Sequence, residues 1–173
     1  LMAPRRTLVV EVHGMADFWQ SPDVITIHNL RQPSATPAVK RVADLSLQSP
    51  AGTVIPVHER DIHGRGIISV VRELAHSGIS TNTVVVINGA TPEQASAAMA
   101  ALGEIHPSVT TVWAESDAAL ELRDRLSRTI GVQPGEGKGY ACWLGIGYLL
   151  CCTNAHAIAL QDADVEDYTA DMS

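Results

Sequence analysis

Short apolar runs rich in β-branched residues alternate with helical patterns along the chain, and this alternation constrains the fold more than any other feature. The runs cover residues 52–57, 83–87 and 109–113. Each is too short for a helix and is typical of a buried strand. The helical patterns follow at residues 67–78, 91–102 and 118–130. Gly78 is a plausible helix stop, and Thr91 followed by Pro92 is a typical helix start.

Strands joined by helices at this spacing predict an α/β fold. We expect a doubly wound, mostly parallel, Rossmann-like sheet with helices on both faces. In such sheets the ligand lies beyond the carboxyl ends of the strands. The polar segments that begin after Pro56, at Asn88, at Lys138 and at Asp162 all fall at those ends. We therefore expect them to converge on one site.

The domain is expected to span residues 51–173, which is long enough for one core. Residues 1–50 are interpreted as a lead-in segment. Within it, residues 1–14 are interpreted as non-native sequence, because the chain begins with Leu and Met15 could be the native start.

Composition excludes several classes of function. The net charge of -7 and the aromatic content of 4% do not suit a nucleic-acid-binding protein. The longest apolar run, residues 141–152, is shorter than the roughly 20 residues that cross a membrane. Its three cysteines, Cys142, Cys151 and Cys152, are interpreted as reduced core thiols of a cytoplasmic protein.

A single cation stands among glycines ahead of that apolar run. Lys138 lies in Gly-Glu-Gly-Lys-Gly, residues 135–139, which we interpret as a loop. Glycines let backbone N-H groups approach a ligand closely, and the ammonium group adds a positive charge. The segment therefore predicts a site for an anion such as a diphosphate.

Two carboxylates, Asp162 and Asp164, follow the last apolar strand. Residues two apart in an extended chain share one side, so both carboxylates are expected to point to one place. Close carboxylates repel each other unless a cation lies between them. Oxygen ligands of this kind suit Mg²⁺ or Mn²⁺, which commonly share their remaining positions with phosphates. Together with Lys138, the motif predicts a nucleotide-diphosphate ligand.

Four motifs together resemble the nucleotide-sugar half of GT-A glycosyltransferases. They are Pro56 after the first strand, the turn at residues 88–91, Gly-Lys-Gly at 137–139 and Asp-Ala-Asp at 162–164. The spacing of the last two is similar to that in glucosyl-3-phosphoglycerate synthases and their mannosyl relatives. The resemblance is strongest over residues 137–165.

The resemblance implies roles for individual residues. Those expected to bind the nucleotide sugar are Pro56, Val57, Glu59, Asp61, Asn88, Gly137, Lys138, Gly139 and Asp162. Either Glu59 or Asp61 could provide the acidic group that the family has after its proline. Asp162 and Asp164 are expected to hold the metal, Mg²⁺ or Mn²⁺. The donor would be UDP-glucose or a similar compound, and glucose or mannose would pass to a phosphoglycerate-like acceptor.

Two other functions stay open. The chain ends soon after Asp164, before the family's acceptor site, so we expect a C-terminally truncated fold with unknown catalytic residues. Such a chain could be a non-catalytic nucleotide-binding module or an inactive fragment, and its uncovered apolar surface favours self-association as a homodimer.

A haloacid-dehalogenase-type phosphatase is the other function that stays open, because such enzymes also carry Asp-x-Asp, although usually after the first strand.

Overall fold

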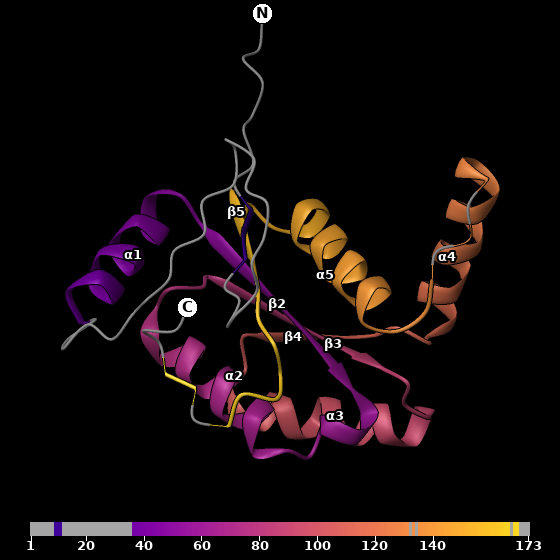
Figure 1. Ribbon diagram of the computed structural model, residues 1–173, viewed down its shortest axis with the longest axis horizontal. Helices are drawn as coiled ribbons and strands as arrows, with labels where there is room; N and C mark the ends of the chain where they lie inside the picture. The colour runs from indigo at the N-terminus through magenta and orange to yellow at the C-terminus, as the bar shows by residue number, and fades with distance from the viewer. Residues whose placement is uncertain (1–8, 12–35, 132, 134, 167, 170–173) are drawn as a thin grey trace, which may run out of the picture.

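A computed structural model of the protein describes residues 9–11, 36–131, 133, 135–166 and 168–169. Most of residues 1–14, and the start expected at Met15, lie outside the described residues. The elements, shown in Figure 1, are β1 (Val9–Glu11), α1 (Thr36–Gln48), β2 (Ala51–His58), a 3-10 turn η1 (Glu59–Asp61), α2 (Arg65–Ser77), β3 (Asn82–Asn88), α3 (Pro92–Ile105), β4 (Val109–Trp113), α4 (Asp117–Ile130), α5 (Lys138–Cys152) and β5 (Ala157–Leu160).

The described strands form a five-stranded sheet in the order β1-β5-β2-β3-β4. Every neighbouring pair is parallel. The chain builds outward from β2 through β3 to β4, and then returns through α5 to place β5 on the other side of β2. The direction of winding therefore reverses between β2 and β5, where a ligand crevice is expected.

Helices cover both faces of this sheet, which confirms the predicted α/β class. One core contains Ile55, Val57, Val85 and Ile87 packed against α2 and α3. The other contains Val54, Val84 and Val86 packed against α5, with Ala119 of α4. Figure 1 shows α2 and α3 below the sheet and α5 above it. Alternate residues of β2 and β3 thus serve opposite cores, as expected of parallel strands buried on both faces.

Local sequence signals set several helix boundaries as predicted. Gly78 ends α2 in a left-handed conformation with φ 67°. Thr91 caps α3 by accepting a hydrogen bond from the Gln94 N-H, and Pro92 is the first helical residue. Caps of this kind satisfy backbone groups that the helix leaves without partners.

Among the described residues before residue 51, two elements occur that the sequence pattern did not predict. β1 pairs with β5, so Val9 lies in register with Ile158. Helix α1 is attached through a small polar residue, because the buried Ser46 hydroxyl donates to the Ile79 carbonyl at 2.7 Å. Leu45 and Leu47 of the same helix are exposed, so its apolar pattern does not mark the buried face. Where the domain begins stays a prediction.

Helix α5 is only partly a core helix. Leu144 and Leu149 are buried, whereas Trp143 and Leu150 are exposed. Cys151 and Cys152 are exposed as well, so placing them in the core was wrong. The reason is that α5 is apolar around its whole circumference but meets the sheet with one side. No helix in the described residues combines the length and apolar character needed to span a membrane.

Candidate functional site

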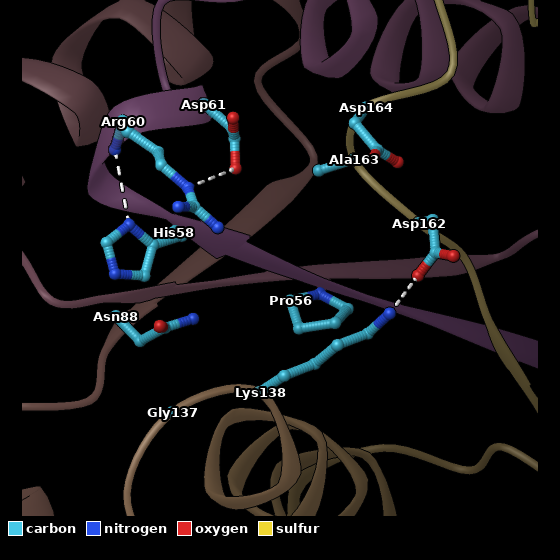
Figure 2. Close-up of a pocket in the computed structure, with 10 residues that line it drawn as sticks. All are labelled: Pro56, His58, Arg60, Asp61, Asn88, Gly137, Lys138, Asp162, Ala163 and Asp164. Atoms are coloured by element: carbon cyan, nitrogen blue, oxygen red, sulfur yellow. Dashed lines mark hydrogen bonds and ion pairs between the residues drawn. The ribbon is translucent and has the colours of Figure 1, made fainter.

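A pocket of about 330 Å³ opens at the carboxyl ends of β2, β3 and β5, beside the start of α5. Figure 2 shows the residues that line it, which are Pro56, His58, Arg60, Asp61, Asn88, Gly137, Lys138, Asp162, Ala163 and Asp164. The pocket lies where the winding of the sheet reverses. Parallel topology therefore brings together segments that are far apart in the sequence.

Seven of the predicted site residues lie in this lining. They are Pro56, Asp61, Asn88, Gly137, Lys138, Asp162 and Asp164. The other three predicted residues, Val57, Glu59 and Gly139, are not among the lining residues. The ligand roles of all ten residues remain predictions.

Lys138 and Asp162 form an ion pair inside the pocket. The Lys138 Nζ donates to Asp162 Oδ1 at 2.5 Å, as Figure 2 shows. The hydrogen bond to Asp162 raises the pKa of Lys138 and outweighs the opposing effect of partial burial. The lysine is therefore charged at neutral pH. Both side chains are more than half exposed, at 66% and 51%, so water can replace either partner at low cost.

Lys138 lies in a helix, although the glycines around it predicted a loop. It is the first residue of α5, and Gly139 is the second. Gly137 precedes the helix with φ 84° and ψ -150°, a conformation that is essentially restricted to glycine. Gly137 thus sets the direction in which the chain enters α5 and so places Lys138 at the pocket.

Asp162 and Asp164 lie on either side of a buried anchor. Ala163 is 6% exposed and packs in the core with α2, whereas both aspartates are exposed. This alternation holds both carboxylates at the pocket, and Figure 2 shows them on the same side of it. Among the described residues, no group of three or more His, Cys, Asp or Glu side chains could enclose a metal ion. Two carboxylates still fit Mg²⁺ or Mn²⁺, because such ions take further oxygens from phosphates and water.

Asn88 is held in a fixed orientation at the floor of the pocket. Its side chain is 4% exposed, and its Nδ2 donates to the Val57 carbonyl at 3.0 Å. This bond assigns the amide so that Oδ1 is the atom left to accept a bond from a ligand. The Val57 side chain is itself 1% exposed and belongs to the core. Val57 therefore serves the pocket through its backbone, which the sequence pattern did not indicate.

Glu59 and Asp61, the two candidates for the acidic residue that follows Pro56, differ in the side chains that they contact. Glu59 Oε2 accepts a hydrogen bond from Gln94 Nε2 at 2.8 Å, which ties it to the start of α3. Asp61 lines the pocket, and its Oδ2 lies 3.6 Å from Arg60 Nε. The geometry therefore favours Asp61 over Glu59 as a ligand-facing carboxylate.

Three lining residues, His58, Arg60 and Ala163, were not among the predicted site residues. The His58 Nδ1 accepts a bond from the Arg60 backbone N-H at 3.4 Å, and its ring lies against Gly89, where an added Cβ would be 2.8 Å from Nε2. His58 was not among the residues expected to bind the ligand. The available signal was alternation, because His58 lies two positions after Pro56 at the end of one strand.

The formal charges of the lining residues are compatible with a bound divalent cation. Two side chains are cationic, Arg60 and Lys138, and three are anionic, Asp61, Asp162 and Asp164. The formal charge of these five side chains is therefore minus one. A divalent ion would change it to plus one. The pocket would then attract a diphosphate that it otherwise repels.

The fold and the pocket define a Rossmann-like α/β protein with a polar pocket at the reversal of its sheet. No protein-family model matches the chain. It is 25% identical over 158 residues to glucosyl-3-phosphoglycerate synthase of Persephonella marina, which covers 91% of this chain and 39% of that relative. It is 23% identical over 157 residues to the protein of the same name from Methanococcoides burtonii, covering 90% of this chain and 38% of that relative.

The chain therefore resembles GT-A-like glycosyltransferases of the glucosyl-3-phosphoglycerate synthase type, as its motifs predicted. The chain spans about two fifths of the length of these relatives.

Proposed function

We propose that this chain binds a nucleoside-diphosphate sugar together with Mg²⁺ or Mn²⁺, as the donor-binding part of a glycosyltransferase. The observation that carries the proposal is the meeting of Lys138, Asp162 and Asp164 at one pocket. Lys138 comes from the start of α5, whereas the aspartates follow β5. A cation and two metal-binding carboxylates at this position suit a ligand with a diphosphate at its centre. The resemblance to glucosyl-3-phosphoglycerate synthases supports the same ligand class.

The nucleoside would occupy the part of the pocket near Pro56, Asp61 and Asn88. The fixed Asn88 Oδ1 would accept from an N-H group of the base. Asp61 would accept from a ribose hydroxyl. These groups lie around the ends of β2 and β3, and the diphosphate would extend from there towards α5 and β5.

Lys138 would bind the diphosphate, and Asp162 and Asp164 would hold the metal. When bound, the metal would neutralise negative charge on the diphosphate leaving group. The Lys138 ammonium would exchange its contact with Asp162 for one with a phosphate oxygen. Its positive charge would then lie where charge develops as the bond between sugar and diphosphate breaks. A fixed group in that position is typically worth about 3 kcal/mol of barrier lowering.

The names of the relatives extend the proposal to the acceptor. Both are glucosyl-3-phosphoglycerate synthases, so we propose glucose, with mannose as the alternative sugar, and a phosphoglycerate-like acceptor. We also propose that the protein is cytoplasmic and forms a homodimer. The residues that would hold the acceptor are not assigned.

Calorimetric titration tests this function. UDP, UDP-glucose and GDP-mannose would each be titrated into the full chain with Mn²⁺ and again with EDTA. We expect one nucleotide sugar to bind much more tightly with Mn²⁺. A transfer assay with 3-phosphoglycerate would follow for the nucleotide sugar that binds. If no nucleotide shows metal-dependent binding, the proposal is wrong. Binding without transfer would identify the chain as a donor-binding module.

A further inference from the structure

We infer that Gly66, in the first turn of α2, is a positioning residue for Asp164 at the proposed metal site. The inference rests on the proposed function, because Asp164 is assigned there as a metal ligand. Gly66 does not line the pocket and follows no recognisable motif. Its proposed role is to let the backbone at Asp164 lie directly on the helix.

The contact is between backbone and backbone. A Cβ at Gly66 would lie 2.6 Å from the Ala163 carbonyl oxygen and 2.8 Å from the Asp164 carbonyl carbon. It would also lie 3.0 Å from the Asp164 Cα. Real Cβ atoms essentially never approach other atoms as closely as the first two distances. Because none of these atoms belongs to a flexible side chain, no rotamer change can relieve the overlap.

The segment after β5, rather than the helix, would move in response to a side chain. Helix α2 is fixed by Ile67, Val70, Val71 and Leu74, all of which are at most 2% exposed. The segment of residues 161–166 has no helical or strand structure, and Asp162 and Asp164 are exposed on either side of Ala163. A methyl group on Gly66 would therefore push the Ala163–Asp164 backbone away from the helix by several tenths of an ångström.

A shift of this size matters most for a metal ligand, although it also loosens the packing of Ala163 against α2. Distances between metals and their ligands are reproduced within about 0.2 Å in well-formed sites. Displacing Asp164 would therefore impair the metal site while both cores stay assembled. Residues that orient metal ligands typically change affinity by about 10- to 100-fold when they are replaced.

Other helical glycines provide matched controls. A Cβ at Gly145 of α5 would lie 2.4 Å from Val54 Cγ1 and 3.0 Å from Val86 Cγ2, which is a core overlap with no contact to the aspartates. A Cβ at Gly103 of α3 would meet nothing within 4 Å. Gly145→Ala is thus a destabilising control, and Gly103→Ala controls for the change from glycine to alanine in a helix.

The experiment measures UDP affinity by calorimetry with Mn²⁺ and with EDTA in the full-length wild type, Gly66→Ala, Gly145→Ala and Gly103→Ala. Mn²⁺ should increase the UDP affinity of the wild type by a certain factor. We expect this factor to be at least about tenfold smaller in Gly66→Ala. Both controls should keep the increase, although Gly145→Ala lowers the melting temperature. An unchanged increase in folded Gly66→Ala would overturn the inference. Absence of the increase in the wild type would instead refute the proposed function.

A double-mutant cycle with Asp164→Asn separates positioning from a general structural effect. If Gly66 acts through Asp164, Gly66→Ala should not lower the UDP affinity any further in the Asp164→Asn background, whether Mn²⁺ or EDTA is present. Additive losses would overturn the inference. If Gly66→Ala fails to fold, Ala163→Gly loosens the same segment without an overlap, because it removes the buried methyl group that anchors the backbone beside Asp164. We then expect a reduced Mn²⁺-dependent increase, and a full increase in that variant would count against the positioning role.

Discussion

The Lys138 Nζ lies 2.5 Å from Asp162 Oδ1, so two residues proposed to bind different parts of one ligand contact each other. The lysine is assigned to the diphosphate and the aspartate to the metal. A metal that takes Asp162 releases Lys138 for phosphate, and a phosphate that takes Lys138 releases Asp162 for metal. Binding of the two should therefore be mutually favourable, and linkage requires the effect to be equal in both directions.

Lys138→Ala should weaken UDP much more than uridine. The lost contact is a charge-assisted hydrogen bond to phosphate, so we expect a decrease in UDP affinity of about tenfold or more. Uridine lacks phosphate and should bind Lys138→Ala and the wild type alike. Titrations of both ligands with Mn²⁺ present provide the measurement. Equal losses for the two would show that Lys138 supports only the fold.

Asp164→Asn should abolish the Mn²⁺ dependence of UDP binding without unfolding the protein. The amide keeps the size of the carboxylate but removes the charge that a divalent ion requires. Asp61→Asn is the matched control, because Asp61 lines the same pocket beside Arg60. It should keep the metal dependence. Titration with and without EDTA distinguishes them, and equal behaviour of the two variants would contradict the assignment.

Gly137→Ala should destabilise the protein and misplace Lys138. The φ of 84° and ψ of -150° at Gly137 are strained for any residue with a Cβ, at a cost of about 1–3 kcal/mol. Gly147→Ala lies within α5 in open space and should instead stabilise the protein by about 0.5–1 kcal/mol. Urea unfolding gives both free energies. A neutral Gly137→Ala would show that the entry into α5 is adaptable.

Tyr168→Phe should flatten the loss of stability at alkaline pH. Tyr168 is 3% exposed, and its hydroxyl has no hydrogen-bond partner among the described residues. Burial, with a smaller effect of the Glu73 charge, raises the pKa of Tyr168 from 10.0 to about 12. The folded state therefore holds the proton more tightly than the unfolded state does. Its contribution to stability is complete below pH 10 and is lost as the pH rises towards 12.

Melting temperatures measured from pH 8 to pH 11 test this difference. At pH 8 the variant should be at least as stable as the wild type, because phenylalanine removes a buried hydroxyl without a partner. A parallel decline of both proteins above pH 10 would show that Tyr168 does not cause the alkaline loss.

Local sequence signals predicted the elements around the pocket, because strand propensity and helix capping depend only on residues that are close together in the sequence. β-branched runs gave β2, β3 and β4, and the Thr91 cap gave the start of α3. Helix α1 escaped prediction because it is attached through Ser46, while Leu45 and Leu47 remain exposed. Helical periodicity reports only a face that is both apolar and buried.

The candidate site was predictable where a motif follows a strand. Lys138, Asp162 and Asp164 were found in this way, and the pocket brings them together. Arg60 was not recognised, because a polar residue after a strand carries no sign of the direction its side chain takes. His58 ends β2 and was missed although its alternation with Pro56 indicated the side on which it lies. The choice between Glu59 and Asp61 depended on Gln94, which is 35 positions from Glu59 and contacts it only in the folded chain.

The sequence by itself determined the alternation of strands and helices, and with it a parallel sheet whose polar loops share one edge. Only the tertiary structure decided the contacts across that edge: the Lys138–Asp162 ion pair, the Asn88 bond to the Val57 backbone and the position of Gly66 under Asp164. The physical reason is range. Propensity and periodicity act within one element, whereas these contacts join segments that meet only after β5 has packed beside β2.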